Sequence, residues 1–154
     1  MKKLKLAIAA SLAIMTQAQP VHSQNQGNVN PFYKEYTIVH KTVPFSLVRN
    51  EHYMPAIERG IKLHNDEIDA IVNNPSAPTF ENTIVALERS GADLNRVLNT
   101  FYPLLSADSD DELMEISLEV SKKLSAHSTG ISLNQGLWKR IKEVYENKDS
   151  YKLL

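Results

Sequence analysis

Apolar residues recur at intervals of four and three after residue 50, which is the spacing of one face of an α-helix. The first run covers residues 51–73 and has this stripe: Tyr53, Ile57, Ile61, His64, Ile68 and Ile71 or Val72. Pro55 falls in the first turn, where proline is tolerated. Asn73, Asn74 and Pro75 then stop the pattern, so we predict one amphipathic helix over residues 51–73.

The stretch NNPSAPTFENTIVALERSG, residues 73–91, leads into a second helix. Pro78 keeps the chain extended, and Thr79 is placed to cap the next helix, with Glu81 in its first turn. The second stripe continues to residue 101: Phe80, Ile84, Leu87, Gly91, Leu94, Leu98 and Phe101. Because Gly91 lies on this stripe, we expect it to approach a neighbouring backbone closely. We expect Pro103 to end or kink the helix.

Two more helices are predicted toward the C-terminus. Ser109 and Glu112 match a capping box for a third helix, and Gly130 obscures its end. Its stripe is Leu113, Ile116, Val120, Leu124, His127 and Ile131. A fourth helix, over about residues 135–147, carries Leu137, Trp138, Ile141, Val144 and Tyr145. We interpret Trp138 as a core residue rather than a platform for a ligand, and the adjacent pair Lys139 and Arg140 as part of a solvated face.

The connections between these helices are short, which makes consecutive helices antiparallel neighbours. The seven-residue repeat predicts shallow crossing angles. The predicted fold class is therefore all-α, an antiparallel bundle of about four helices. The last residues, KDSYKLL, offer Asp149 or Ser150 as a further helix cap and then the apolar Tyr151, Leu153 and Leu154. We therefore expect residues 51–154 to be a helical domain that is truncated at its C-terminus.

The first 50 residues differ from the rest. Lys2, Lys3 and Lys5 precede an apolar segment over residues 6–15, and small residues follow, so we predict a signal peptide over residues 1–23 cleaved after Ala18 or Ser23. An ordinary N-terminal helix is the alternative. Residues 24–50 contain no helical period. They are predicted to form an extended arm that is pressed against another surface and is not a free linker, because linkers rarely carry so many large apolar side chains: Phe32, Tyr33, Tyr36, Phe45 and Leu47.

Composition excludes several classes of site. The chain has no cysteine, which excludes disulfides and thiolate zinc sites. Without the three lysines of the predicted signal, 14 basic and 18 acidic residues remain, a balance that does not favour nucleic acid or an anionic membrane as partner. The apolar segment of the signal is too short to span a bilayer. The mature protein is predicted to be exported, either periplasmic or secreted, without a membrane partner.

Candidate chemistry is sparse. His64 and His127 lie on the buried stripes of two helices, so they could form a metal or proton site, but no third ligand is evident and packed core histidines are the favoured interpretation. The acidic residues Asp108, Asp110, Asp111, Glu112 and Glu115 resemble a calcium loop. However, Leu113 stands where such a loop needs glycine, which favours a charged helix N-terminus. No H-E-x-x-H, G-x-S-x-G or phosphate loop occurs.

Several segments together resemble the N-terminal region of bacterial dipeptidyl carboxypeptidase and oligopeptidase A, of the thimet oligopeptidase family of zinc metallopeptidases. In chain order they are NPFYKEY (30–36), VPF (43–45), EHYMPAIERGI (51–61), IDAIVNNPSAPTFENTIVALERSG (68–91), SAD (106–108) and KLSAHS (123–128). The fourth segment is long and specific. The resemblance covers residues 30–154, although Pro103 and Gly130 are atypical for helices at their positions.

The resemblance implies a two-lobed helical fold around a narrow channel that admits short peptides, with zinc on the channel floor. It implies that the zinc ligands and the glutamate base belong to an H-E-x-x-H helix and a downstream glutamate, neither of which has a counterpart here. No catalytic or metal residue is therefore assigned in this chain, and its substrate-binding residues stay unknown. The implied role is that of a rigid channel wall, whose partner is the missing C-terminal catalytic part of the same polypeptide.

Two other interpretations stay open: a free-standing helical binding module, and an inactive helical protein that associates with itself. The sequence also leaves open whether the parent enzyme is a dipeptidyl carboxypeptidase or an endo-oligopeptidase, because that difference depends on the missing part.

Overall fold

The computed structural model describes residues 29–34, 36 and 42–151. The predicted signal peptide lies outside the described residues, as do Leu153 and Leu154. The helices are α1 (Tyr53–Val72), α2 (Ala86–Arg89), α3 (Ala92–Ala107), α4 (Asp111–Ser132) and α5 (Gln135–Glu146). Shorter helical segments are η1 (Pro31–Tyr33), η3 (Asn50–His52), the π-helical η4 (Phe80–Val85) and η5 (Lys148–Ser150). The described residues contain no strand, and the predicted all-α class is confirmed.

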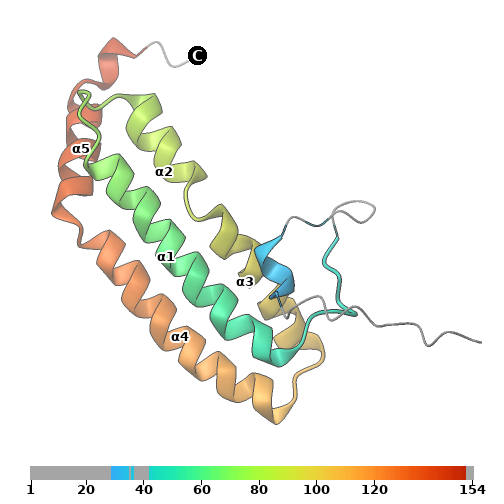
Figure 1. Cartoon of the computed structure of the whole chain (residues 1–154). Helices are drawn as coiled ribbons and strands as arrows, with labels where there is room; N and C mark the ends of the chain where they lie inside the picture. Colours follow the sequence, from blue (N-terminus) through green and yellow to red (C-terminus); the bar gives the residue numbers. More distant parts are fainter. Residues whose placement is uncertain (1–28, 35, 37–41, 152–154) are drawn as a thin grey trace, which may run out of the picture.

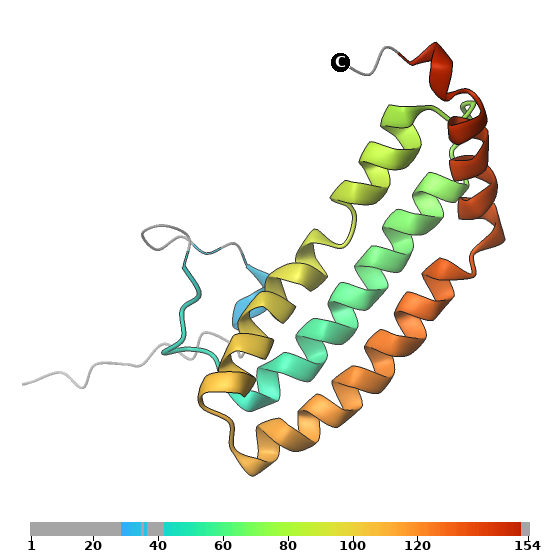
Figure 2. The ribbon, with the colours of Figure 1, turned by 180° about the vertical axis from the view of Figure 1, so that it is seen from behind.

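Helix α1 lies in the middle of the arrangement, with α2 and α3 along one side and α4 along the other (Figures 1 and 2). Helix α3 runs opposite to both α1 and α4, as the short connections predict. The prediction of an antiparallel neighbour is wrong for α5, which continues beyond α4 and packs on α1 and η4. Only Leu133 and Asn134 connect α4 to α5, and Asn134 caps α5.

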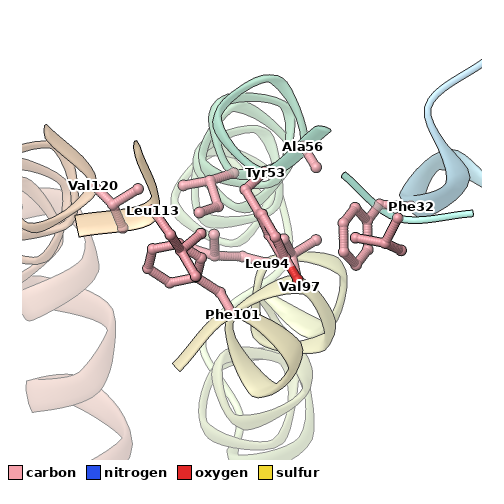
Figure 3. Close-up of a cluster of buried hydrophobic side chains, with 10 residues drawn as sticks. Phe32, Tyr53, Ala56, Leu94, Val97, Phe101, Leu113 and Val120 are labelled. Carbon is pink, nitrogen blue, oxygen red and sulfur yellow. The ribbon is translucent and has the colours of Figure 1, made fainter. Parts of the chain in front are cut away.

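The main core fills the space between the N-terminal half of α1, α3, α4 and the arm (Figure 3). Its centre is an aromatic series in which the Tyr53 ring lies 5.3 Å from that of Phe32 and 5.2 Å from that of Phe101. The buried members of this core are Phe32, Val48, Tyr53, Ala56, Ile57, Leu94, Val97, Phe101, Leu113 and Val120. A second, smaller cluster of Ile68, Ile71 and Leu137 joins α1 to α5.

The arm packs on the helices through Phe32, as predicted. Asn30 accepts a hydrogen bond from the Phe32 N–H at 3.0 Å and donates one to the His52 carbonyl at 2.7 Å. The Arg96 guanidinium on α3 donates to the Phe32 carbonyl at 2.9 Å. The Tyr33 ring also contacts α1, with the Arg59 guanidinium 5.0 Å from its centroid, and Tyr36 packs against the main core. Phe45 and Leu47 are exposed, so the prediction is wrong for these two side chains.

The second predicted helix is not continuous. It is divided into η4, α2 and α3, because Ser90 is extended and Gly91 has a positive φ of 73°. Pro103 does not end α3, which continues to Ala107. The prediction that Asp149 or Ser150 caps a further helix is also wrong. The segment η5 is a single turn, and Tyr151 is extended, with its ring 6.4 Å from that of Phe80.

The cap of α4 differs by one residue from the prediction. Asp110, not Ser109, accepts the Leu113 N–H, at 2.7 Å, and it also accepts hydrogen bonds from the Asn50 side chain. The Leu113 backbone N–H, followed by Asn50, lowers the pKa of the Asp110 carboxyl. Asp110 is also bonded to Asn50 in η3, and this contact distant in sequence favours it over the adjacent Ser109 as the cap of α4.

Candidate functional site

The loop over residues 73–79, between α1 and η4, is held by its own side chains. The Thr79 hydroxyl accepts the Asn82 N–H at 3.1 Å, and the Asn82 side-chain oxygen accepts the Thr79 N–H at 2.8 Å. The Asn82 amide also donates to the Ala77 carbonyl at 3.0 Å. Thr79 is therefore the predicted cap, and Asn82 completes a reciprocal capping box.

Replacing Thr79 with alanine removes the acceptor for the Asn82 N–H. We expect Thr79→Ala to lower the free energy of unfolding by about 1 kcal/mol, which is typical of an N-cap threonine. Thr79→Ser keeps the hydroxyl and is expected to stay close to the wild type. The measurement is the denaturant midpoint of unfolding of the wild type and the two variants. Equal midpoints for the alanine and serine variants would contradict the capping role.

Arg140, on α5, holds the same loop from the other side. Its side chain is buried, with 7% of the residue exposed, and donates to the Asn74 carbonyl at 3.0 Å, the Ser76 carbonyl at 3.3 Å and the Asn82 Oδ1 at 3.1 Å. Sequence analysis assigned the pair of Lys139 and Arg140 to a solvated face, and for Arg140 this is wrong. Its position between Leu137 and Val144, three residues after one and four before the other, is the signal that marks it as inward-facing.

Beside this loop lies an open surface cavity of about 400 Å³. Its lining residues are Glu67, Ala70, Ile71, Asn74, Asn82, Ala86, Arg89 and Ser90. The two charged groups already have partners, because Glu67 accepts the Gly91 N–H at 2.7 Å and Arg89 lies 3.4 Å from Glu81. The cavity is a recess with a mainly apolar surface at the junction of α1, η4 and α2, and its lining shows no activated nucleophile.

Three elements meet at a pair of histidines next to this cavity. His64 projects from α1 and His127 from α4, and their Nδ1 and Nε2 atoms, respectively, lie 3.0 Å apart. The other nitrogen of His64, Nε2, lies 3.1 Å from the Ser90 hydroxyl, which stands at the end of α2. The two histidines, which the sequence pattern places on the buried stripes of separate helices, do contact each other, and Ser90 as their third partner was not predicted.

The hydrogen-bond partners fix which nitrogens carry protons. The Ser90 hydroxyl donates to the Leu87 carbonyl at 2.6 Å, so it must accept from His64 Nε2. His64 Nδ1 is then an acceptor, and His127 Nε2 donates to it. His127 Nδ1 is left as a buried lone pair without a hydrogen-bond partner in the described structure. Both rings are neutral in this arrangement, and burial, with a smaller contribution from His64, lowers the pKa of His127.

Gly91 packs directly against this pair. A Cβ atom on Gly91 would lie 2.8 Å from His64 Nδ1, and the positive φ independently disfavours any other residue. The expected close approach at Gly91 is therefore present. The neighbour is a side-chain ring rather than a backbone segment, and the glycine is the N-cap residue of α3, between two helices, instead of lying within one.

The described residues do not fit a zinc centre. They contain no group of three or more His, Cys, Asp or Glu side chains placed to hold a metal ion. The two histidines that do converge are hydrogen-bonded to each other instead. The acidic residues near Asp110 lie at the start of α4, as the helix-terminus interpretation predicts. In the described part of the chain, no helix combines the length and apolar character needed to cross a membrane.

The interpretation of Trp138 as a core residue is wrong. It is 59% exposed, and Tyr145, two turns further along α5, is 65% exposed. The buried face of α5 consists instead of Leu137, Arg140 and Val144. Because the buried face passes through Arg140, Trp138 and Tyr145 lie outside it, on the exposed side of the helix.

Comparisons with known proteins agree with the resemblance. No family model matches the chain. The chain is 37% identical over 123 residues to dipeptidyl carboxypeptidase of Salmonella typhimurium, a match that covers 80% of this chain and 18% of that protein. Dipeptidyl carboxypeptidase of Escherichia coli is 36% identical over 122 residues, covering 79% and 18%. Oligopeptidase A of Haemophilus influenzae is 32% identical over 95 residues, covering 62% and 14%. The chain thus matches less than a fifth of the length of these relatives.

Proposed function

We propose that this chain, a relative of dipeptidyl carboxypeptidase and oligopeptidase A, supplies a structural helical region of a zinc peptidase that acts on short peptides. The observation that carries the proposal is the 37% identity over 123 residues, which extends across four fifths of the chain. A match of this length concerns a whole folded unit rather than a local motif.

The proposed role is to form part of the wall of a substrate channel. The chain contains no H-E-x-x-H sequence, and the described residues hold no three-ligand metal cluster. We therefore derive no chemical step from its side chains and assign zinc to the larger part of the relatives that lies outside the match. The features that suit a wall are structural: a layer of long helices, a loop held by Arg140, and a buried aromatic core that anchors the arm.

Export to the periplasm or the exterior is part of the proposal and depends on the predicted signal peptide. The proposal does not distinguish removal of dipeptides from peptide C-termini from internal cleavage. Both a dipeptidyl carboxypeptidase and an oligopeptidase A match the chain.

A chimera tests the proposed function. The matching 122-residue segment of the Escherichia coli dipeptidyl carboxypeptidase is replaced with the aligned residues of this chain, and release of dipeptides from a blocked peptide is measured. We expect the chimera to be active, chelators to abolish its activity, and the present chain alone to release no dipeptide with added zinc.

The matched control is the same relative with the segment deleted, which is expected to be inactive. Circular dichroism and light scattering establish whether each protein is folded and whether the chain alone is monomeric. A folded but inactive chimera would count against the proposal and favour a separate binding module. Zinc-dependent cleavage by the chain alone would refute its non-catalytic role.

A further inference from the structure

The contact of His127, His64 and Ser90 joins segments that are far apart in sequence. It connects α4 to the middle of α1, and α1 to the turn where the second predicted helix breaks. These polar side chains do not belong to the main apolar core. Gly91 lies beside them, and the His64 ring occupies the place where a Cβ atom of residue 91 would lie. The position of α4 relative to the α2–α3 turn therefore depends here on hydrogen bonds between titratable groups.

The direction of these hydrogen bonds limits how many protons the pair can hold. His64 Nε2 must carry a proton because the Ser90 hydroxyl donates elsewhere, to the Leu87 carbonyl. A first additional proton enters at the buried Nδ1 of His127, which has no hydrogen-bond acceptor there, because the position between the rings already holds the Nε2 proton of His127. Two imidazolium rings have no acceptor nitrogen, so full protonation places N–H against N–H across the 3.0 Å contact and breaks it.

The surrounding charges do not relieve this constraint. Neither ring of the pair forms an ion pair with a carboxylate in the described part of the chain. On α1, Glu67 accepts the Gly91 N–H at 2.7 Å. Several charged groups on the packed elements form ion pairs with each other: Lys62 with Asp66 on α1 at 2.6 Å, Lys123 on α4 with Glu58 on α1 at 3.0 Å, Arg89 on α2 with Glu81 on η4 at 3.4 Å, and Arg96 with Asp93 on α3 at 2.8 Å.

We propose that the His127–His64–Ser90 contact is an acid-sensitive joint that holds α4 on α1 and the α2–α3 turn while both rings are neutral. The joint opens when both histidines are protonated. Acid sensitivity requires that protonation favour the unfolded chain. The lowered pKa of His127 meets this requirement, because the folded chain binds fewer protons than the unfolded chain as the pH falls below about 6.5. The contribution of His127 to stability is fully present above that pH and is lost progressively as the pH falls below it.

The size of the effect follows from proton linkage. With an unfolded-state pKa of about 6.5, a His127 side chain that stays unprotonated in the fold lowers the folding equilibrium constant about tenfold between pH 7.5 and 5.5. We expect this loss in the wild type and its disappearance in His127→Phe, which keeps a ring of similar size that cannot titrate. His52→Gln is the matched control, since His52 lies outside the pair and accepts the Arg49 N–H at 2.9 Å.

The experiment uses the full chain and measures urea unfolding at both pH values. The same pH dependence in wild type and His127→Phe would overturn the proposal. If His127→Phe does not fold, nuclear magnetic resonance of the wild type decides instead. Ring-nitrogen shifts at pH 7.5 are expected to show the Nε2–H form for His64 and His127, and amide exchange at Ser90 and Gly91 is expected to accelerate beyond its intrinsic pH dependence at pH 5. An Nδ1–H form of His64, or exchange that follows the intrinsic rate, would refute the joint.

Discussion

Gly91→Ala is expected to destabilise the chain by about 2–5 kcal/mol. A left-handed conformation costs a residue with a Cβ atom about 1–2 kcal/mol, and forced overpacking adds about 1–3 kcal/mol. Both terms apply here, since Gly91 has a φ of 73° and its Cβ position lies 2.8 Å from His64 Nδ1. The neighbour can move little, because both nitrogens of the His64 ring are hydrogen-bonded. A loss of this size is a large part of the roughly 5–15 kcal/mol stability of a typical domain.

Gly130→Ala is the matched control. Gly130 lies within α4 with no heavy atom within 4 Å of its Cβ position, so alanine there is expected to stabilise the chain by up to about 1 kcal/mol through helix propensity. Denaturant midpoints give both values. A double-mutant cycle with His64→Ala separates the two causes at Gly91, because only the steric term depends on the ring. A Gly91→Ala chain as stable as the wild type would show that neither cause operates.

Local signals in the sequence were sufficient where the determinant is itself local. Thr79 caps its helix because a hydroxyl and an extended residue after Pro78 are enough to place it. The stripe of α1 is likewise confirmed, since the helix is long and its buried residues Tyr53, Ile57, Ile68 and Ile71 follow a single period. The proximity of His64 and His127 followed from the same periodicity on α1 and α4.

The same periodicity concealed the break at Gly91. The interval of apolar residues stays at four and three through Leu87, Gly91 and Leu94, so the pattern alone cannot distinguish a continuous helix from η4, α2 and α3 joined in similar register. The break depends on a positive φ at Gly91 and on contacts from α1, through Glu67 and His64. Partners so distant in sequence leave no local signal, which is also why Ser90 was not predicted.

The prediction of the buried face of α5 was wrong because it assumed that a charged side chain faces the solvent. Arginine was assigned to the solvent and Trp138 to the core, and the structure reverses both, with Arg140 at 7% and Trp138 at 59% exposure. The carbonyls of the loop over residues 73–79 need donors, and a guanidinium supplies several in one plane. The requirement belongs to the loop, 60 residues earlier in the chain, so α5 alone does not reveal it.

Arg140→Ala is therefore expected to lower the free energy of unfolding by about 2–4 kcal/mol. Hydrogen bonds from a charged group contribute about 1.5–3 kcal/mol each, and water replaces part of that contribution because Ser76 is exposed. The loss should concentrate in the loop, so amide exchange at Thr79 and Asn82 is expected to accelerate more than exchange in α3. Arg140→Lys keeps the charge but not the planar group of donors, and should recover only part of the stability. Lys139→Ala, at the exposed neighbouring position, should remain within about 0.5 kcal/mol of the wild type. If Arg140→Ala were as mild as Lys139→Ala, the loop would not depend on α5, and the structural role proposed for this arginine would be lost.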